Sequence, residues 1–237
     1  MNICVFGDSV AKGVVYDENK SKYTFLKENF LTLVQSVTNI EVKNFAKFGC
    51  TVNKGSEILH KQIDKLKDYD YTVLEFGGND CDLNWAEVAK DPKCQHLAQV
   101  PIENFRKKYE DMIETTRNAG SNPVLLTLPP LDSEKFFNWV SKGLNKENIL
   151  SFLGNDVDFI FRWHASYNDM VWGLGQEYDI PVIDIRTDFL SQPNYRNLLC
   201  IDGMHPNQEG HKVIASFIEK RLNSLLKIKL NDQSSQN

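Results

Sequence analysis

The chain has 237 residues, of which 41% are hydrophobic and 25% charged, an ordinary composition for one folded domain with a sizeable core. The formal net charge of −5 provides no basic surface for nucleic acid or for an anionic membrane. No apolar run approaches the roughly 20 residues that span a bilayer. We therefore expect neither nucleic-acid binding nor stable membrane insertion, and these quantities leave the oligomeric state open.

The five cysteines are scattered, and no two of them form a CxxC pair. Free thiols in a reducing compartment account for this pattern better than a disulfide framework or a zinc site. The N-terminus enters an apolar run directly, without the basic segment and cleavage site of a signal peptide. These features predict a cytoplasmic protein without metal or cofactor, although export by a non-classical route stays open.

Short apolar runs alternate with helical patterns along the chain. The runs typical of strands are residues 2–6, 40–46, 71–76, 123–128 and 181–185, and the run 40–46 alternates like a half-exposed edge strand. Helical spacing of apolar residues covers 23–34, 53–67, 103–119, 157–177 and the segment from about 207 to 227. The aromatic stretch 131–156 is less regular and predicts helical pieces inserted beyond the fourth strand.

Strands that alternate with helices predict βαβ units, and hence a mostly parallel sheet covered by helices on both faces. About five strands favour a flavodoxin-like three-layer α/β/α sandwich, an α/β fold with doubly wound strand order. We predict a single domain over residues 1–230, with the helical insertion at 131–156, and a polar tail over 231–237.

Four polar stretches follow predicted strands or precede the last helix. They are Gly7-Asp8-Ser9, residues 44–51 with Gly49 inside, Gly77-Gly78-Asn79-Asp80, and residues 202–206 with Asp202, His205 and Pro206. Loops at the carboxyl ends of strands open onto the ligand crevice of such a sheet. We therefore expect these stretches to meet at one edge.

Brought together, these residues predict an acyl-transfer site. Ser9 would be the nucleophile, and His205 would take its proton and later return it to the leaving group. Asp202, three positions before His205, would orient the imidazole and stabilise its protonated form. The backbone N–H groups of Ser9 and Gly49 and the side-chain amide of Asn79 are candidate donors to the oxyanion.

Structural roles compete with these chemical ones. Ser9 alone could cap a helix or a turn, and Asp8 is predicted to fix its loop by local hydrogen bonds. Asp202 suits a helix N-cap and Pro206 an early helix position, so Asp202 can serve two purposes. The other histidines have no acidic or ligand partners nearby in sequence and are predicted to be core or surface residues: His60, His96, His164 and His211.

The ordered set of stretches resembles the sequence blocks of the SGNH hydrolases, also called the GDSL esterase/lipase family. The matching blocks are residues 7–9 (with Val10 where leucine is usual), 44–51, 77–80 and 202–206, which together span nearly the whole chain. The resemblance implies that Ser9, Asp202 and His205 form a catalytic triad. It also implies that Ser9, Gly49 and Asn79 form the oxyanion hole.

The resemblance implies a serine esterase that hydrolyses small or medium acyl esters, such as O-acetyl groups on a carbohydrate, through an acyl-enzyme on Ser9. Alternatives are a lysophospholipase or thioesterase, an acyltransferase with the same site, or a non-catalytic flavodoxin-like module that binds a phosphorylated ligand. The binding module leaves Asn79 and the pair of Asp202 and His205 unexplained. Within 131–156, Trp139 and Phe152 are candidates for the wall of an acyl pocket.

Overall fold

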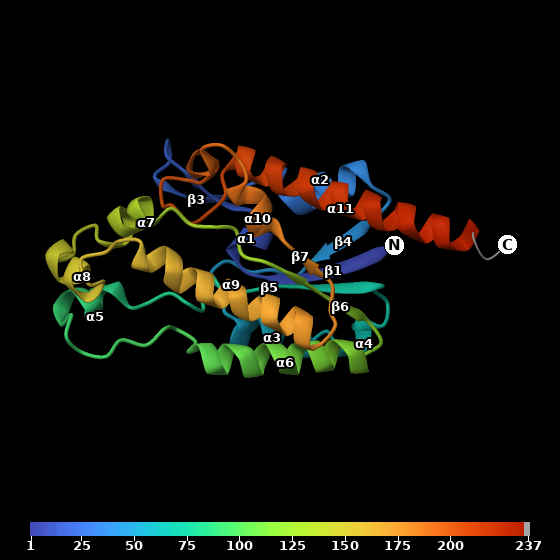
Figure 1. Ribbon diagram of the computed structural model, residues 1–237, viewed down its shortest axis with the longest axis horizontal. Coiled ribbons are helices and arrows are strands. Elements are labelled where there is room, and N and C mark those ends of the chain that lie inside the picture. Colours follow the sequence, from blue (N-terminus) through green and yellow to red (C-terminus); the bar gives the residue numbers. More distant parts are fainter. Residues whose placement is uncertain (235–237) are drawn as a thin grey trace.

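The structure, a computed structural model, describes residues 1–234 and the side chains of residues 1–222. Five strands form one parallel sheet with helices on both faces (Figure 1). The strands are β1 (Asn2–Gly7), β4 (Glu41–Asn44), β5 (Tyr71–Glu75), β6 (Asn122–Leu126) and β7 (Val182–Ile183). Their spatial order, β4-β1-β5-β6-β7, confirms the predicted α/β fold and its flavodoxin-like strand order.

Strand β1 lies inside the sheet and carries the first motif. Val5 pairs with Asn44 of β4 on one side and with Val73 of β5 on the other. The apolar residues 4–6 are buried, as a parallel strand covered on both faces requires. Because β1 ends at Gly7, it delivers Ser9 to the carboxyl edge of the sheet, where β5 also ends.

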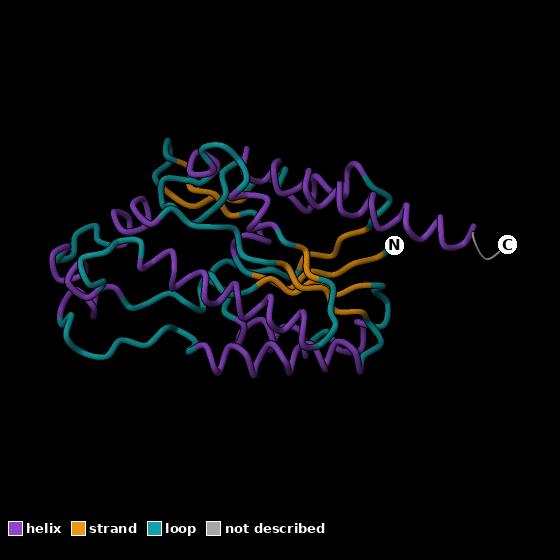
Figure 2. The backbone as a smooth tube through the Cα atoms, viewed as in Figure 1, coloured by secondary structure: helices purple, strands orange, loops and turns teal. Residues whose placement is uncertain are grey.

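Two helical layers enclose the sheet, each with its own apolar core (Figures 1 and 2). One layer contains α2 (Phe30–Val37), α10 (Ile185–Leu190) and α11 (Gln208–Ser234). The other contains α3 (Val52–His60), α6 (Ile102–Asn118) and α9 (Phe159–Glu177). No helix among the described residues is long and apolar enough to cross a membrane.

A third, smaller core lies at the end of the molecule away from the termini (Figure 1). It is built from α5 (Trp85–Lys90), α7 (Ser133–Val140), α8 (Lys146–Phe152) and the first turns of α9. Helices α7 and α8 are the predicted helical pieces of 131–156, and each begins at a side-chain cap, Asp132 or Asn145. Helix α5 lies in a stretch where no helix was expected from the sequence.

The predicted helix over 23–34 is wrong in its first half. Residues 22–25 form β3 (Lys22–Phe25), which pairs antiparallel with β2 (Val14–Asp17) in a separate hairpin. Helix α2 begins only at Phe30, because Oδ1 of Asn29 accepts the N–H groups of Leu31 and Thr32. Gly13, with a φ of +79°, closes the short helix α1 (Ser9–Lys12) and turns the chain into the hairpin.

Other differences concern where elements end. The predicted helix 53–67 divides into α3 and α4 (Ile63–Leu66). The last strand stops at Ile183 because Asp184 caps α10, a helix that was not predicted. A short 3-10 helix, η1 (Tyr195–Leu198), follows. Helix α11 continues past the expected end at about 227, so residues 231–234 of the predicted tail are helical. Residues 235–237 lie outside the described part, and the single domain over 1–230 stays a prediction.

Candidate active site

The hydroxyl of Ser9, the imidazole of His205 and the carboxylate of Asp202 form a line of hydrogen bonds. Oγ of Ser9 lies 2.8 Å from Nε2 of His205, and Nδ1 of His205 lies 2.7 Å from Oδ2 of Asp202. The three residues are at most 3% exposed. An ionised carboxylate can only accept, so Nδ1 carries the ring proton and Nε2 is free to accept the proton of Ser9.

The turn before α11 fixes this arrangement locally. Oδ1 of Asp202 accepts the N–H groups of Met204 (3.0 Å) and His205 (3.1 Å), which leaves Oδ2 for the imidazole. Gly203 has a φ of +73°, and a Cβ there would lie 2.6 Å from the backbone nitrogen of Phe136. Because α11 starts only at Gln208, Asp202 caps its own turn and not the helix, contrary to the sequence expectation.

Charge in this turn favours an ionised Asp202. Burial raises the pKa of its carboxyl, but the hydrogen bond and the attraction from His205, with the two backbone N–H groups, hold the net pKa below its usual value. Tyr23 places its ring 5.2 Å from the ring of His205. Burial and the negative charge of Asp202 raise the pKa of Tyr23, so its hydroxyl stays protonated at neutral pH.

Three loops carry the residues that the sequence predicts as oxyanion donors. Gly49 has a φ of +68°, and a Cβ there would meet no atom within 4 Å. The positive φ is a backbone conformation that favours glycine at this position. Nδ2 of Asn79 donates to Oδ2 of Asp8 (3.1 Å) and, more weakly, to the carbonyl of Cys50 (3.4 Å). The backbone N–H groups of Ser9 and Gly49 have no acceptor within residues 1–234.

A buried pair of carboxyl groups supports the loop of Ser9. Oε2 of Glu75, at the end of β5, accepts the N–H groups of Asp8 (3.2 Å) and Ala11 (3.3 Å). Oδ1 of Asp8 accepts the N–H of Val10 at 2.8 Å, which confirms its predicted role in the turn. Burial, and secondly the charge of Asp8, raises the pKa of Glu75 well above its usual value.

Asp80 is a third buried carboxyl group in this region. Its Oδ1 accepts the N–H of Val52 at the start of α3 at 2.8 Å. Burial raises the pKa of Asp80 to about 7. The hydrogen bond from Val52 opposes this increase, and the negative charge of Asp8 adds to it. Although acidic groups gather here, no group of three or more His, Cys, Asp or Glu residues in the described chain is arranged to hold a metal ion.

A comparison with known protein families identifies the family to which these loops belong. The family model of the GDSL-like Lipase/Acylhydrolase family matches residues 5–213, which include every residue of the hydrogen-bonded line. The chain belongs to the GDSL-like lipase/acylhydrolase family. Membership confirms the resemblance stated from the sequence motifs and identifies a hydrolase of the type that acts on esters.

Solved structures of GDSL-like acylhydrolases share the fold over nearly the whole chain. A lipase/acylhydrolase from Enterococcus faecalis matches with a TM-score of 0.63 and 21% identity over 94% of this chain and 95% of its own. A mutant acetyl-xylooligosaccharide esterase from a Geobacillus matches with a TM-score of 0.63 and 19% identity over 92% of each chain. An uncharacterized lipoprotein of Bacillus subtilis is 22% identical and covers 92% of this chain and 88% of its own length.

Two cavities meet beside Ser9 in this GDSL-like acylhydrolase. The smaller, of about 300 Å³, is lined by Ser9, Asn79, Leu128 and Pro129 among others. The larger, of about 380 Å³ and partly open to solvent, is lined mainly by apolar side chains: Leu83, Trp85, Leu131, Phe136, Leu153, Phe159, Ile160 and Trp163. Gly78, His164 and Met204 line both, so the two cavities are neighbours.

An aromatic wall, defined here as Tyr16, Tyr23, Phe48 and Trp139, lies against His205. The ring of Phe48 is 6.3 Å from that of His205, and Phe48 is 51% exposed. Tyr23 contacts both Phe48 (5.3 Å) and Trp139 (6.1 Å), while Tyr16 packs on Trp139 at 4.7 Å. Tyr16 and Tyr23 come from the β2–β3 hairpin, which therefore forms one side of the site.

The two residues expected to wall an acyl pocket, Trp139 and Phe152, line neither of these two cavities. Trp139 belongs to the aromatic wall, and Phe152 packs on His96 at 5.3 Å. Phe136 and Leu153 line the larger cavity instead. Helical spacing alone could not have separated Phe136 from Trp139, because residues 136, 139 and 140 lie at i, i+3 and i+4 on one side of α7.

Proposed function

We propose that the protein is a serine esterase that cleaves small or medium acyl esters through an acyl-enzyme on Ser9. The observation that carries this proposal is the line of hydrogen bonds from Ser9 through His205 to Asp202, at 2.8 and 2.7 Å. Family membership supports the coarser statement that the chain is a hydrolase acting on esters.

The proposed reaction has two halves. As Oγ of Ser9 attacks the ester carbonyl, Nε2 of His205 takes its proton, and ionised Asp202 stabilises the resulting imidazolium. The tetrahedral intermediate expels the alcohol, whose oxygen receives that proton from His205. Water then repeats the sequence: it gives a proton to His205, attacks the acyl-enzyme and releases the acid and free Ser9.

The oxyanion would be held by the backbone N–H groups of Ser9 and Gly49 together with Nδ2 of Asn79. The contact of Asn79 with the carbonyl of Cys50 is the longer of its two bonds, at 3.4 Å, and it is the one that would yield to the oxyanion. The bond to Asp8 would keep the amide in place. Each such donor contributes about 10²–10³-fold in rate.

The position of His205 supports a placement for each half of the substrate. His205 must protonate the leaving oxygen, so the alcohol half lies on its side of Ser9, against the aromatic wall. The acyl half then enters the two cavities, neither of which is lined by His205. An O-acetylated sugar suits this division, because aromatic faces pack against the apolar faces of sugar rings, and the apolar lining of the larger cavity suits an acyl group.

The test compares wild type, Ser9→Ala and Ser121→Ala on p-nitrophenyl esters from acetyl to decanoyl. Ser121 is a matched buried serine, hydrogen-bonded to Thr72 before the start of β6, at the opposite edge of the sheet. We expect Ser9→Ala to lose at least about 10³-fold in kcat, and Ser121→Ala to keep it. A fluorophosphonate should label wild type and not Ser9→Ala.

Three other outcomes would contradict the proposal in different ways. Full activity of Ser9→Ala would exclude Ser9 as the nucleophile. Labelling of Ser9 without turnover of any ester would favour an acyltransferase that needs its own acceptor. Absence of both labelling and turnover would favour the non-catalytic binding module.

The cytoplasmic location belongs to the same proposal and rests on the sequence alone. Fractionation of cells that express the tagged protein tests it. Recovery in the soluble cytoplasmic fraction supports it, whereas recovery with membranes or in the medium would contradict it.

A further inference from the structure

The ring of His164, on α9, is held by a hydrogen bond that determines where its proton lies. His164 is 4% exposed, and its Nδ1 is 3.1 Å from Nη1 of Arg186. A guanidinium group can only donate, so Nδ1 of His164 must accept. In the neutral ring the proton therefore sits on Nε2.

The surroundings of His164 keep the ring neutral. Burial, and secondly the positive charge of Arg186, lowers the pKa of His164 to about 3. At neutral pH the ring is thus a fixed donor with one N–H group, at Nε2.

His164 borders the side of Ser9 on which we place the acyl group. His164 lines both cavities beside Ser9, and within residues 1–222 Arg186 is its one hydrogen-bond partner. Since Nδ1 is turned toward Arg186, Nε2 is the polar atom left for the cavities. Nη2 of Arg186 is fully enclosed without a partner, whereas Nε2 of His164 is not enclosed in this way and retains accessible surface.

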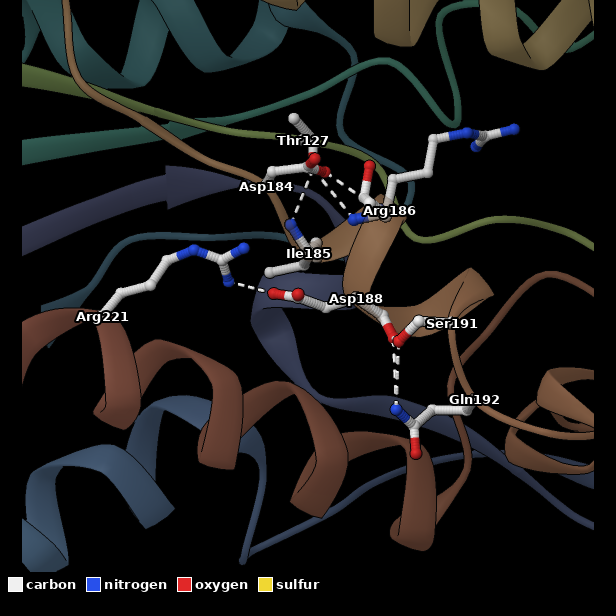
Figure 3. A network of polar contacts seen from close by, with 9 residues as sticks. Thr127, Asp184, Ile185, Arg186, Asp188, Ser191, Gln192 and Arg221 are labelled. Atoms are coloured by element: carbon white, nitrogen blue, oxygen red, sulfur yellow. Dashed lines mark hydrogen bonds and ion pairs between the residues drawn. The ribbon is translucent and has the colours of Figure 1, made fainter.

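Arg186 is anchored so that it can hold the ring. Its backbone N–H donates to Oγ1 of Thr127 at 3.1 Å, and its side chain extends away from this network (Figure 3). The guanidinium lies 4.7 Å from the ring of Phe161 and is 6% exposed as a residue. Burial of a cation with an unpaired donor lowers the stability of a fold. In this protein the buried guanidinium of Arg186 holds the imidazole of His164 in one orientation.

We propose that His164 is a specificity-determining residue whose Nε2–H donates a hydrogen bond to an oxygen atom of the acyl group. The preferred substrates then carry a hydroxyl, ether or carbonyl oxygen on the acyl chain, beyond the ester carbonyl. This inference rests on the proposed esterase function and on the assignment of the acyl half to the cavities.

The test uses pairs of p-nitrophenyl esters in which one CH₂ of the acyl chain is replaced by oxygen. Butyrate is compared with methoxyacetate, and pentanoate with 3-methoxypropanoate. The ratio of kcat/KM within each pair is measured for wild type and variants, so that the intrinsic reactivity of the esters cancels when variants are compared. His164→Phe should lower the ratio for at least one pair by about 3- to 10-fold, the effect of one neutral hydrogen bond.

Two further variants separate specificity from structure. His164→Gln can accept from Arg186 through its oxygen and donate through its nitrogen, so it should restore part of the ratio. His211→Phe removes a buried histidine of α11 that accepts the N–H of Phe30 and lines neither cavity, so it should leave the ratio unchanged.

Unchanged ratios in His164→Phe, with ester turnover intact, would overturn the inference and leave the esterase standing. Nitrogen-15 NMR of histidine-labelled wild type provides a test that needs neither turnover nor a variant. We expect a neutral His164 with its proton on Nε2 at pH 7, and a proton on Nδ1 would overturn the inference. If the wild-type protein hydrolysed none of the esters, that result would instead contradict the proposed function.

Discussion

Glu75 holds Asp8 from the neighbouring strand: Oε2 of Glu75 accepts the backbone N–H of Asp8 at 3.2 Å, one residue before Ser9. The same oxygen accepts the N–H of Ala11 at 3.3 Å. Strand β5 thus supports both ends of the turn that carries the hydroxyl of Ser9.

Replacement of Glu75 tests this support. Glu75→Leu leaves two buried N–H groups unpaired, and we expect a loss of about 2–4 kcal/mol in the free energy of unfolding. Glu75→Gln keeps an acceptor oxygen and should lose less than about 1 kcal/mol. Urea unfolding at pH 7 measures both, and equal stability of the two variants would contradict the role of Oε2.

Asn79→Ala removes the side-chain donor of the proposed oxyanion hole. We expect kcat to fall about 10²–10³-fold while KM changes little, because the donor acts on charge that develops in the transition state. Steady-state kinetics on a p-nitrophenyl ester checks this. A rise in KM at unchanged kcat would instead make Asn79 a residue that binds the ground state.

Gly49→Ala tests the backbone N–H of Gly49 as an oxyanion donor. The substitution strains the backbone there, because Gly49 has a left-handed φ of +68°. A Cβ meets no atom there, so the variant should lose only about 1–2 kcal/mol of stability, from the strained backbone. Any displacement of the N–H of Gly49 should then lower kcat as well. Gly143 is the matched control, since its φ is +73° and its surroundings are equally open.

The two glycine variants are compared by urea unfolding and by kcat. Gly143→Ala should show the same loss of stability with full activity. Equal effects of the two substitutions on kcat would indicate that Gly49 acts through folding and not through the oxyanion.

Asp80 makes stability depend on pH. Its pKa is about 7 in the folded protein and about 3.8 when unperturbed, so the folded state retains a proton that the unfolded state has released. This contribution to stability is complete below about pH 4 and is lost as the pH rises through 7. Asp80→Asn keeps an oxygen for the N–H of Val52 and does not titrate.

Urea unfolding of wild type and Asp80→Asn at pH 5 and pH 8 measures this contribution. Between pH 5 and pH 8, the free energy of unfolding of wild type should fall by on the order of 1–3 kcal/mol more than that of the variant. The subtraction removes groups that titrate alike in both proteins. Parallel stability curves would show that Asp80 is ionised throughout.

Leu83→Phe tests the assignment of the acyl half to the larger cavity. The added ring reduces the space for a chain, so kcat/KM for the hexanoyl ester should fall at least about 10-fold relative to the acetyl ester. A p-nitrophenyl ester series measures this ratio. Equal losses on all chain lengths would place the acyl group elsewhere.

Phe48→Ala is the complementary variant on the aromatic wall. It should leave the acyl-chain preference unchanged, because Phe48 lines neither cavity. It should weaken turnover of an acetylated xyloside relative to ethyl acetate. A change in acyl preference would contradict the separation of the two halves.

The sequence correctly predicted which loops lie at the carboxyl edge of the sheet, and the reason is physical. Parallel strands end at one edge, so Ser9 after β1 and Asn79 after β5 had to come near each other once the strands were recognised. The pair of Asp202 and His205 could be predicted because the two residues lie three positions apart in a single turn. By contrast, Lys22–Phe25 has both helical and strand-like spacing, and only pairing with Val14–Asp17 makes it a strand.

The sequence by itself determined the α/β fold and the residues at the carboxyl edge, because these follow from local periodicity and from the ends of strands, whereas the order of the strands in the sheet follows from their pairing. Only the tertiary structure decided the cavities, the aromatic wall and the pairs of Glu75 with Asp8 and Arg186 with His164. Those pairs join different elements, 67 and 22 positions apart in the chain. Their chemistry depends on burial and on donor direction, which packing between elements creates and which no local pattern encodes.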